Sequence, residues 1–283
     1  MSKIEWTDRT WCPNQGCTQI SEGCKNCYAK KMHKRLRAMG IEKYQNDFSE
    51  VQLWLQALTE PTKWKKPSKV FVNSMSDTFH GNLTFEQINE VFNTMQYCNR
   101  HTYQVLTKRP DRALEFIQWK RKQPGIIHNW ELPDNIWFGV TVENQEQANK
   151  RIPILLEIPA KVRFVSVEPM LSNVDLNQVA FKKFQSWLNG NNQGSLDWVI
   201  CGGESGHNAR PMHPDWVRNL KDQCDMFKTP FFFKQWGEWW PGEKGRLYRE
   251  KSIDYTDGQQ MIRAGKKLAG CEIDGKEYKQ FPK

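Results

Sequence analysis

The stretch that predicts the fold is KVFVNSMSDTFHGNLTFEQINEVFNTMQYCNRHTYQVLT, residues 69–107 of the 283-residue chain. It contains a β-branched apolar run, a polar cluster, a helical pattern and a second β-branched run, in that order. A capping box, Thr84-x-x-Gln87, opens the helical pattern, in which apolar residues recur every three or four positions from Phe85 to Met95. A strand, a helix and the next strand in this order form the unit of a parallel β/α sheet.

The same order of run, polar cluster and helical pattern repeats along the chain, and a first short strand is expected near residues 9–12. The pattern predicts an α/β fold, a partial (open) TIM-like β/α barrel of about six to seven parallel strands. We expect the barrel to span residues 1–240 and residues 241–283 to form an irregular extension packed on the same domain. The six runs start at Lys69, Tyr103, Ile136, Val162, Trp198 and Pro230.

Composition narrows the class of protein. Lys and Arg number 41 against 32 Asp and Glu, a net charge of +9 that favours polyanionic partners. Thirteen tryptophans suit a stacking surface or, more commonly, an aromatic core. No apolar stretch reaches the roughly 20 residues of a membrane span, and the N-terminus lacks the apolar segment of a secretory signal. We therefore expect a cytoplasmic protein without membrane association; the sequence does not indicate its oligomeric state.

A cysteine cluster near the N-terminus predicts a metal site. Cys17, Cys24 and Cys27 follow the pattern Cys-x6-Cys-x2-Cys, and thiolates select iron–sulfur clusters or zinc. Three ligands would leave one iron of a four-iron cluster open, whereas a structural zinc site requires four ligands. Cys12 can supply that fourth ligand or be a small buried residue. The spacing alone leaves both metals open.

Polar residues follow each predicted strand, and in a β/α barrel such residues meet at the carboxyl-terminal rim, where active sites lie. They can also act as helix caps, but six mixed clusters exceed what capping requires. The placement predicts Glu168, Glu204 and Lys234 as residues that face a substrate or hold the pocket walls. The clusters are Asn73–Asp77, Thr107–Arg109, Thr141–Asn144, Ser166–Pro169, Gly202–Ser205 and Lys234–Glu238.

Motifs in a fixed order carry a resemblance to a known family. The chain resembles a phage- and prophage-associated family with a three-cysteine motif, which is itself similar to radical S-adenosylmethionine enzymes and, more distantly, to spore photoproduct lyase. The family commonly has asparagine at the position of Cys12, which favours three ligands, whereas most radical enzymes have a shorter first gap. The motifs are Ile4-Glu-Trp-Thr-Asp8, Gly16-Cys17, Gly23-Cys24, Cys27-Tyr28-Ala29, Leu106-Thr-Lys-Arg-Pro110, Val167-Glu-Pro169, Gly202-Gly-Glu-Ser-Gly206, Lys234-Gln-Trp-Gly237 and Gly265-Lys-Lys267.

The resemblance implies an enzyme with a [4Fe–4S] cluster on Cys17, Cys24 and Cys27. The open iron would bind S-adenosylmethionine, and one electron from a flavodoxin- or ferredoxin-type donor would release a 5′-deoxyadenosyl radical. The resemblance also implies residues that bind the cofactor. These are Asn73, Ser74, Ser76 and Asp77 for the methionine amine, Lys108 and Arg151 for its carboxylate, and Thr141 and Glu143 for the ribose.

The substrate class follows from charge. Basic residues directly after the third cysteine, among them Lys30, Lys34 and Arg37, and the lysines between Lys63 and Lys69 would form a track for DNA or RNA. We expect a lyase or modifying reaction on nucleic acid or a nucleotide precursor. Two alternatives remain: a zinc- or cluster-bearing nucleic-acid-binding protein without catalysis, and a radical enzyme that acts on a small metabolite.

Overall fold

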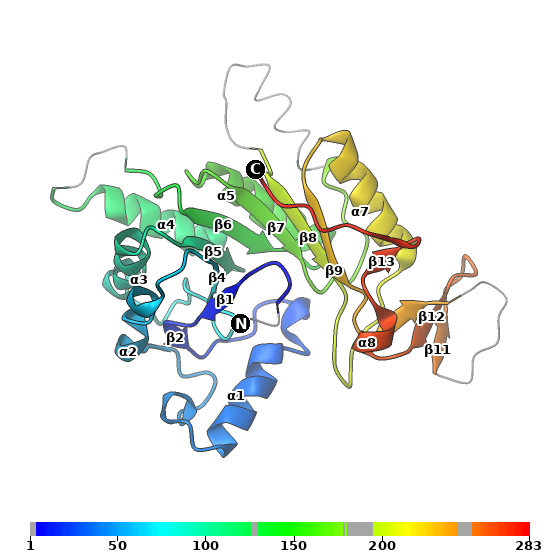
Figure 1. Cartoon of the computed structure of the whole chain (residues 1–283), viewed down its shortest axis with the longest axis horizontal. Coiled ribbons are helices and arrows are strands. Elements are labelled where there is room, and N and C mark those ends of the chain that lie inside the picture. Colours follow the sequence, from blue (N-terminus) through cyan, green and yellow to red (C-terminus); the bar gives the residue numbers. More distant parts are fainter. Residues whose placement is uncertain (1–3, 126–129, 178, 180–194, 243–250) are drawn as a thin grey trace. The chain divides into compact units, whose positions relative to one another are not determined.

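The computed structural model describes residues 4–125, 130–177, 179, 195–242 and 251–283. Its main sheet has seven strands in the order β1-β4-β5-β6-β7-β8-β9, which is their order along the chain (Figure 1). The order and the parallel pairing confirm the predicted α/β class and the partial β/α barrel. The strands are β1 (Arg9–Trp11), β4 (Lys69–Val72), β5 (Thr102–Thr107), β6 (Ile136–Thr141), β7 (Arg163–Val167), β8 (Trp198–Gly202) and β9 (Phe231–Gln235).

Helices follow the strands where the sequence predicts them. The Thr84 side chain accepts a hydrogen bond from Gln87 N, and the Gln87 side chain accepts one from Thr84 N, so both halves of the capping box form. Pro110 and Pro214 open their helices at the position that needs no N–H donor. The helices are α1 (Tyr28–Ala38), α2 (Leu55–Leu58), α3 (Phe85–Tyr97), α4 (Pro110–Arg121), α5 (Gln145–Glu157), α7 (Pro214–Met226) and α8 (Lys266–Ala269). Short 3₁₀ turns span Glu22–Cys24, Glu42–Tyr44 and Pro61–Lys63.

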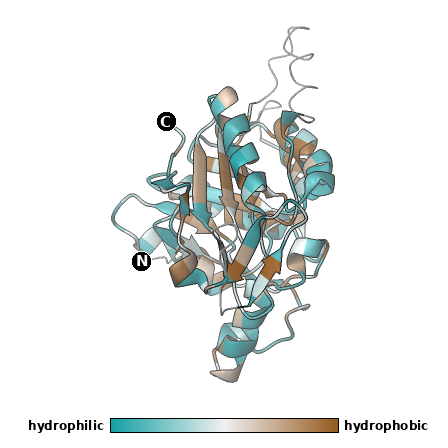
Figure 2. Ribbon diagram, turned by 90° about the vertical axis from the view of Figure 1, so that its right-hand side faces the viewer, coloured by the Kyte–Doolittle hydropathy of each residue, from teal (hydrophilic) through white to brown (hydrophobic). Residues whose placement is uncertain are grey.

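The strands are apolar because parallel sheets are covered on both faces. Every residue of β8 is buried, and so are the last three residues of β4. Figure 2 shows the strands mainly in brown, while the helices carry teal residues on their outer sides. The pattern of apolar runs therefore predicts that burial of these strands is the main source of the protein's stability.

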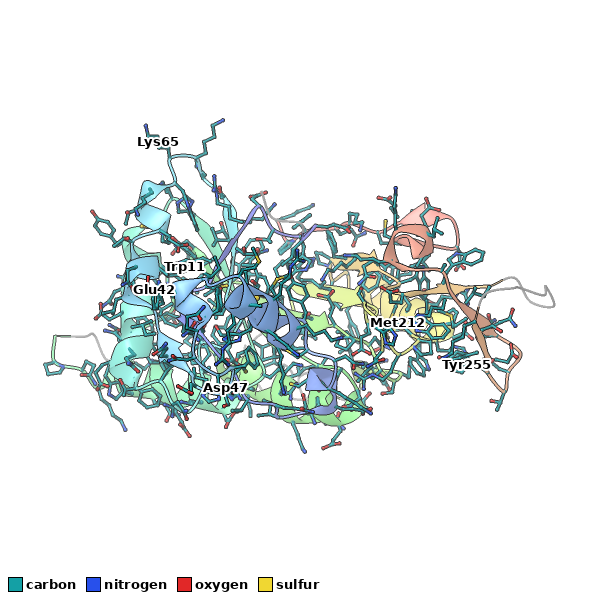
Figure 3. The ribbon with its side chains drawn as sticks, turned by 90° about the horizontal axis from the view of Figure 1, so that it is seen from below. Trp11, Glu42, Asp47, Lys65, Met212 and Tyr255 are labelled. Carbon is teal, nitrogen blue, oxygen red and sulfur yellow. The ribbon has the colours of Figure 1, made fainter. Side chains whose placement is uncertain are left out.

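The chain divides into two compact units, each with its own core. The first comprises Met1–Val140 and Ile154–Arg163 and contains β1, β4 and β5. The ring of Phe79 packs against three other phenylalanines of this unit. Trp11 is fully buried, and its indole N–H donates to Ala57 O at 2.8 Å. Figure 3 shows Trp11 inside and Lys65 projecting outward.

The second unit comprises Thr141–Pro153 and Phe164–Lys283 and contains β8, β9 and α7. Trp198 is fully buried among aromatic rings, and the indole N–H of the buried Trp239 donates to Ala209 O at 2.7 Å. Buried tryptophans in both units confirm the core as the reason for much of the tryptophan content.

Residues after 240 form short antiparallel pairs where the sequence gives no strand pattern. β10 (Trp239–Pro241), β12 (Gln260–Arg263) and β11 (Ser252–Asp254) form a three-stranded sheet in that order. The predicted boundary at residue 240 stays a prediction.

Two further strand pairs are short. One joins β13 (Glu272–Ile273) to β14 (Lys276–Glu277), and the other joins β2 (Asn14–Gln15) to β3 (Gln52–Leu53). Across the described ranges, every helix is too short or too polar to cross a bilayer.

Candidate functional site

The three cysteines of the predicted metal site lie on the segment between β2 and α1. Cys17 N donates to Phe48 O at 2.7 Å, which fixes the start of the loop. Gly16 precedes it with φ +79°, and a Cβ there would lie 2.6 Å from Glu50 O, so only glycine fits. Cys24 ends a 3₁₀ turn, and Cys27 caps α1, whose N-terminus is favourable for a thiolate.

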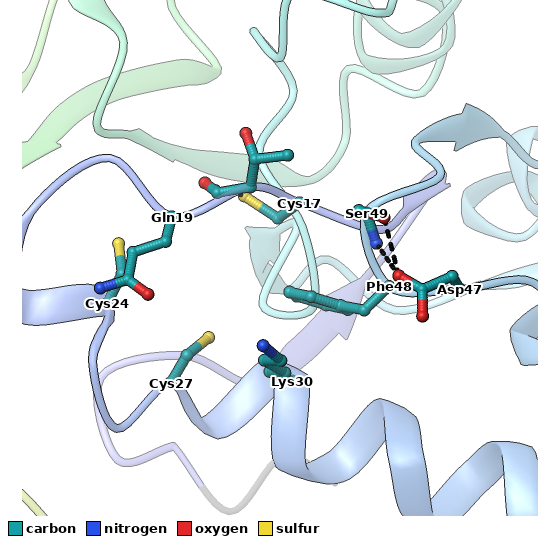
Figure 4. A pocket seen from close by; sticks show the side chains of 9 residues that line it. Cys17, Gln19, Cys24, Cys27, Lys30, Asp47, Phe48 and Ser49 are labelled. Carbon is teal, nitrogen blue, oxygen red and sulfur yellow. Dashed lines mark hydrogen bonds between the residues drawn. The ribbon is translucent and has the colours of Figure 1, made fainter.

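All three thiols line one pocket of about 210 Å³ in the first unit. Figure 4 shows their sulfurs around a common space, with the Lys30 side chain beside Cys27 and the Phe48 ring on another side of the space. Cys12 is not among the residues that line the pocket. Its sulfur lies 3.4 Å from the Ser74 hydroxyl oxygen. The pocket therefore contains three cysteines, as the three-ligand prediction requires. Its remaining lining residues are Thr18, Gln19, Asp47 and Ser49.

The spread of the sulfurs differs from that of a mononuclear zinc site. Four thiolates at about 2.3 Å from one zinc ion stand about 3.8 Å from one another. Among the described residues, the group of three possible ligands whose atoms all lie within 4.8 Å is His213, Asp215 and Asp257, not the cysteines. In a cubane cluster each cysteine binds a different iron, so its sulfurs stand farther apart. The three sulfurs therefore do not all lie at the spacing of ligands on a single zinc ion in this structure.

The His213 group is a helix cap with surface carboxylates. Asp215 N donates to His213 Nδ1 at the start of α7, and Asp257 lies 2.9 Å from Nε2. Both ring nitrogens already have partners in the protein. Asp215 also pairs with Arg218. The arrangement has an ordinary structural explanation.

Two cations from the end of β5 are directed at the cysteine sulfurs. Lys108 Nζ lies 3.7 Å from Cys24 Sγ, and Arg109 Nη1 lies 3.7 Å from Cys17 Sγ. Burial alone would raise the pKa of Cys24, but Lys108 and nearby hydrogen bonds outweigh it, so the pKa lies below its ordinary value. Burial, reinforced by Asp77, raises the pKa of Cys17 to about 11 despite the opposing effect of Arg109. The two sulfurs thus have different electrostatic surroundings.

Asp77 is the centre of the hydrogen-bond network behind these cations. Its Oδ1 accepts from Phe79 N at 3.0 Å and from the Thr107 hydroxyl at 2.7 Å. Its Oδ2 accepts from Lys108 N at 3.1 Å and from Arg109 Nη1 at 3.0 Å. A carboxylate offers about four acceptor positions, so the protein itself uses all of those on Asp77.

The other predicted amine-binding residues lie close by, in the loop after β4. Ser76 Oγ donates to Asn14 O at 2.9 Å. Asn73 has φ +62°, and its amide N–H groups donate to Asn14 Oδ1 and Thr78 Oγ1. Asn73 Oδ1 is a buried acceptor without a partner among the described residues. The structure therefore brings Asn73, Ser74, Ser76, Asp77 and Lys108 together in the first unit.

Thr141, Glu143 and Arg151 lie together in the second unit. Arg151 Nη1 donates to Glu143 Oε2 at 2.9 Å and to Thr141 O at 2.7 Å. The two charged side chains are 5% and 0% exposed. Their charges are therefore matched inside the protein. Their predicted roles toward ribose and carboxylate stay predictions.

The three predicted catalytic residues also lie in the second unit, each within an ion pair. Lys234 Nζ lies 2.9 Å from Glu168 Oε1, at side-chain exposures of 21% and 15%. Glu204 accepts hydrogen bonds from the backbone N–H and the guanidinium of Arg210. A Cβ on Gly203 would lie 1.9 Å from Trp236 O, so only glycine allows the two backbones to approach this closely.

Sequence reasoning assigned no role to Arg109, although its motif was recognised. Besides Cys17 and Asp77, its guanidinium donates to Thr18 O at 3.1 Å and to Thr18 Oγ1 at 3.2 Å. The signal was available, because Arg109 directly follows Lys108 at a strand end. What the sequence does not show is that the cysteine loop lies against that end.

Comparison with known families assigns the chain to one of them. A family model described as "Protein of unknown function (DUF5131)" matches residues 1–282. The chain belongs to this family. No curated protein matches it. The fold of this DUF5131 chain is similar to that of spore photoproduct lyase in a cysteine-to-serine variant, at 12% identity and TM-score 0.41, over 89% of this chain and 67% of that one. The same enzyme complexed with dinucleoside spore photoproduct matches at 12% identity and TM-score 0.38, over 88% of this chain and 66% of that one.

Proposed function

We propose that this protein is a radical S-adenosylmethionine enzyme whose [4Fe–4S] cluster is held by Cys17, Cys24 and Cys27. The observation that carries the proposal is the pocket lined by Cys17, Cys24 and Cys27, which Cys12 does not line. Such a donor set leaves one iron without a protein ligand. Asn73 Oδ1, a buried acceptor without a partner among the described residues, and the half-buried Lys108 ammonium would supply the acceptor and the cation for the two ends of an amino acid.

The bound cluster would supply the electron that cleaves S-adenosylmethionine to methionine and a 5′-deoxyadenosyl radical. The protein's own residues have simpler tasks. Lys108 offsets the methionine carboxylate, and the acceptors of the loop after β4, on Asn73 and Ser74, orient its amine. Thr141, Glu143 and Arg151 remain candidates for further cofactor contacts, and Glu168, Glu204 and Lys234 for substrate contacts. A flavodoxin- or ferredoxin-type protein would deliver the electron.

The test is reductive cleavage of S-adenosylmethionine by anaerobically reconstituted protein without added substrate. We expect slow release of 5′-deoxyadenosine in the presence of dithionite, measured by chromatography. The Cys24→Ala variant, which removes one ligand, should release none. Equal release by both proteins would show that free iron causes the reaction, and no release by wild-type protein carrying a cluster would contradict the proposal.

We further propose a nucleobase in DNA or RNA, or a nucleotide precursor, as the substrate of a lyase or modifying reaction. The support is charge: Lys30, Lys34 and Arg37 are exposed on α1, which begins directly after Cys27. A base must be single-stranded or flipped to reach a buried pocket, at a cost of a few kcal/mol. Exposed cations beside the pocket would offset that cost by binding phosphates.

Salt-dependent binding tests this substrate class. We expect the affinity for single-stranded DNA or RNA to fall with a log–log slope of about 0.7 per phosphate neutralised. Charge reversals at Lys30, Lys34 and Arg37 should reduce both the affinity and the slope, whereas Lys122→Glu, an exposed reversal at the end of α4, should not. If wild-type protein does not bind at physiological salt, a small metabolite becomes the better candidate.

A further inference from the structure

Two consecutive side chains place positive charge on two different ligands of the proposed cluster. The Lys108 ammonium donates to Cys24 Sγ and the Arg109 guanidinium to Cys17 Sγ, each at 3.7 Å. Both sit at the carboxyl end of β5, whereas the cysteines lie more than 80 residues earlier in the chain. The contacts therefore depend on the tertiary fold, which holds the cysteine loop against this strand end.

The fold holds the Arg109 guanidinium and the backbone of Lys108 in place. Asp77 accepts from Lys108 N and from Arg109 Nη1, and the other end of the guanidinium is held by Thr18, the neighbour of Cys17. The Arg109 side chain is only 12% exposed. A guanidinium bound on two sides has one orientation, so its hydrogen bond to sulfur is built into the site.

We propose that Lys108 and Arg109 are positioning residues that raise the reduction potential of the cluster by acting on the sulfurs of Cys24 and Cys17, with Asp77 as their anchor. This inference rests on the proposed function. Reduction adds one negative charge to the cluster, and a nearby cation stabilises the charged product more than the reactant. Hydrogen bonds to the sulfurs and the local net charge are known determinants of cluster potentials.

The inference predicts the direction in which the reduction potential shifts when each of the three charged residues is changed. The charge of Arg109 is offset by Asp77 at 3.0 Å. For Lys108 no carboxylate lies within ion-pair distance in the described part of the chain, so its charge acts on the cluster undiminished. Loss of Lys108 should therefore lower the potential more than loss of Arg109, and neutralisation of Asp77 should raise it. A general loosening of the site would not produce opposite shifts.

The experiment is a redox titration of the anaerobically reconstituted cluster, without S-adenosylmethionine, followed by electron paramagnetic resonance. At the wild-type midpoint, we expect Lys108→Met to shift the ratio of reduced to oxidised cluster about tenfold toward oxidised, which corresponds to a midpoint about 59 mV lower. Asp77→Asn should shift the ratio toward reduced. Lys108→Arg should restore the wild-type value. Lys31→Met, which removes the same charge from an exposed position on α1, should leave the ratio unchanged.

The outcomes separate this inference from the proposed function. If the midpoint of Lys108→Met equals that of wild-type protein at the same iron content, and wild-type protein cleaves S-adenosylmethionine, the inference is overturned and the proposed function stands. If wild-type protein assembles no cluster, both are overturned. If Lys108→Met and Arg109→Met both lose the cluster, the cations hold it in place and the tuning role is wrong. Shifts of the same sign in Lys108→Met and Asp77→Asn would also overturn it.

Discussion

Two cations at the first-unit site lie against thiols, whereas three buried or half-buried cations in the second unit lie against carboxylates. Lys108 and Arg109 donate to cysteine sulfurs, and one carboxylate, Asp77, serves the pair. Arg151, Arg210 and Lys234 each pair with a glutamate in the second unit. Each of these three cations is thus neutralised by a carboxylate of its own unit. The first unit retains positive charge for an anionic group, which is what a thiolate-bound cluster provides.

Breaking a buried pair in the second unit should give the largest effect on stability. Glu143→Gln leaves the Arg151 charge buried without a carboxylate, which costs about 3–5 kcal/mol of unfolding free energy. Urea denaturation measures it. The matched control on the same segment is Lys150→Met, which breaks the exposed Lys150–Glu146 pair and should cost less than about 1 kcal/mol. Equal losses of unfolding free energy in the two variants would show that the buried Arg151–Glu143 pair stabilises the fold no more than a surface pair does.

The second largest effect should be on the affinity for S-adenosylmethionine, which we expect to depend more on the first unit than on the second. In cluster-loaded protein, Asp77→Ala should weaken binding by about 1–3 kcal/mol, because the side chain organises the cations and the loop at the first-unit site. The double change Glu143→Gln with Arg151→Met removes both charges of the buried pair and avoids an unpaired one. We expect a smaller loss than that of Asp77→Ala, because the protein already neutralises both charges of this pair. Calorimetry under anaerobic conditions decides between them, and equal losses would show that the second-unit pair contacts the cofactor as closely as the first-unit site does.

The sequence predicted the strands well because each run meets a simple physical requirement. Parallel strands are buried on both faces, so β4 and β8 are mainly apolar segments that stand out from their surroundings. The capping box at Thr84 marks a helix start for an equally local reason. Residues after 240 were not predicted as strands, because pairs such as β13 and β14, of two residues each, are too short to show a period.

The sequence predicted which residues belong to the candidate site, but not which of its charged residues pair with one another. Cysteine spacing predicted Cys17, Cys24 and Cys27, and strand ends predicted which polar clusters carry charge. The sequence does not show which charges neutralise one another. The predicted cofactor residues Glu143 and Arg151 form a pair separated by only eight residues, whereas Arg109 meets a cysteine 92 residues away. Only the tertiary fold distinguishes a self-contained pair from a cation available to a ligand.

A smaller effect should appear as pH dependence of stability in the first unit. His33, His80 and His101 are buried, and desolvation is the main cause that lowers the pKa of each. Below about pH 6.5 the unfolded histidines bind protons while the folded ones do not, so the unfolding free energy rises with pH and is lost as pH falls. Each contributes at most about 1.4 kcal/mol per pH unit in that window.

The variant His33→Phe tests this contribution by urea denaturation between pH 7.5 and 5.5. His33 packs edge-on against Tyr44 and Phe48, and its Nε2 is buried without a partner among the described residues, so an aromatic replacement fits. We expect nearly wild-type stability at the higher pH and a smaller loss at the lower. A loss as large as that of wild-type protein would assign the pH dependence to other groups.

The most direct test of the cluster in the first unit is metal analysis of five proteins reconstituted side by side. Wild-type protein and Cys12→Ala should each hold about four irons per chain with matching sulfide. Cys17→Ala, Cys24→Ala and Cys27→Ala should each lose the cluster, because each removes a ligand from the pocket that Cys12 does not line. Stoichiometric zinc without iron in the wild-type protein, or loss of metal from Cys12→Ala equal to that from the other three variants, would contradict the account.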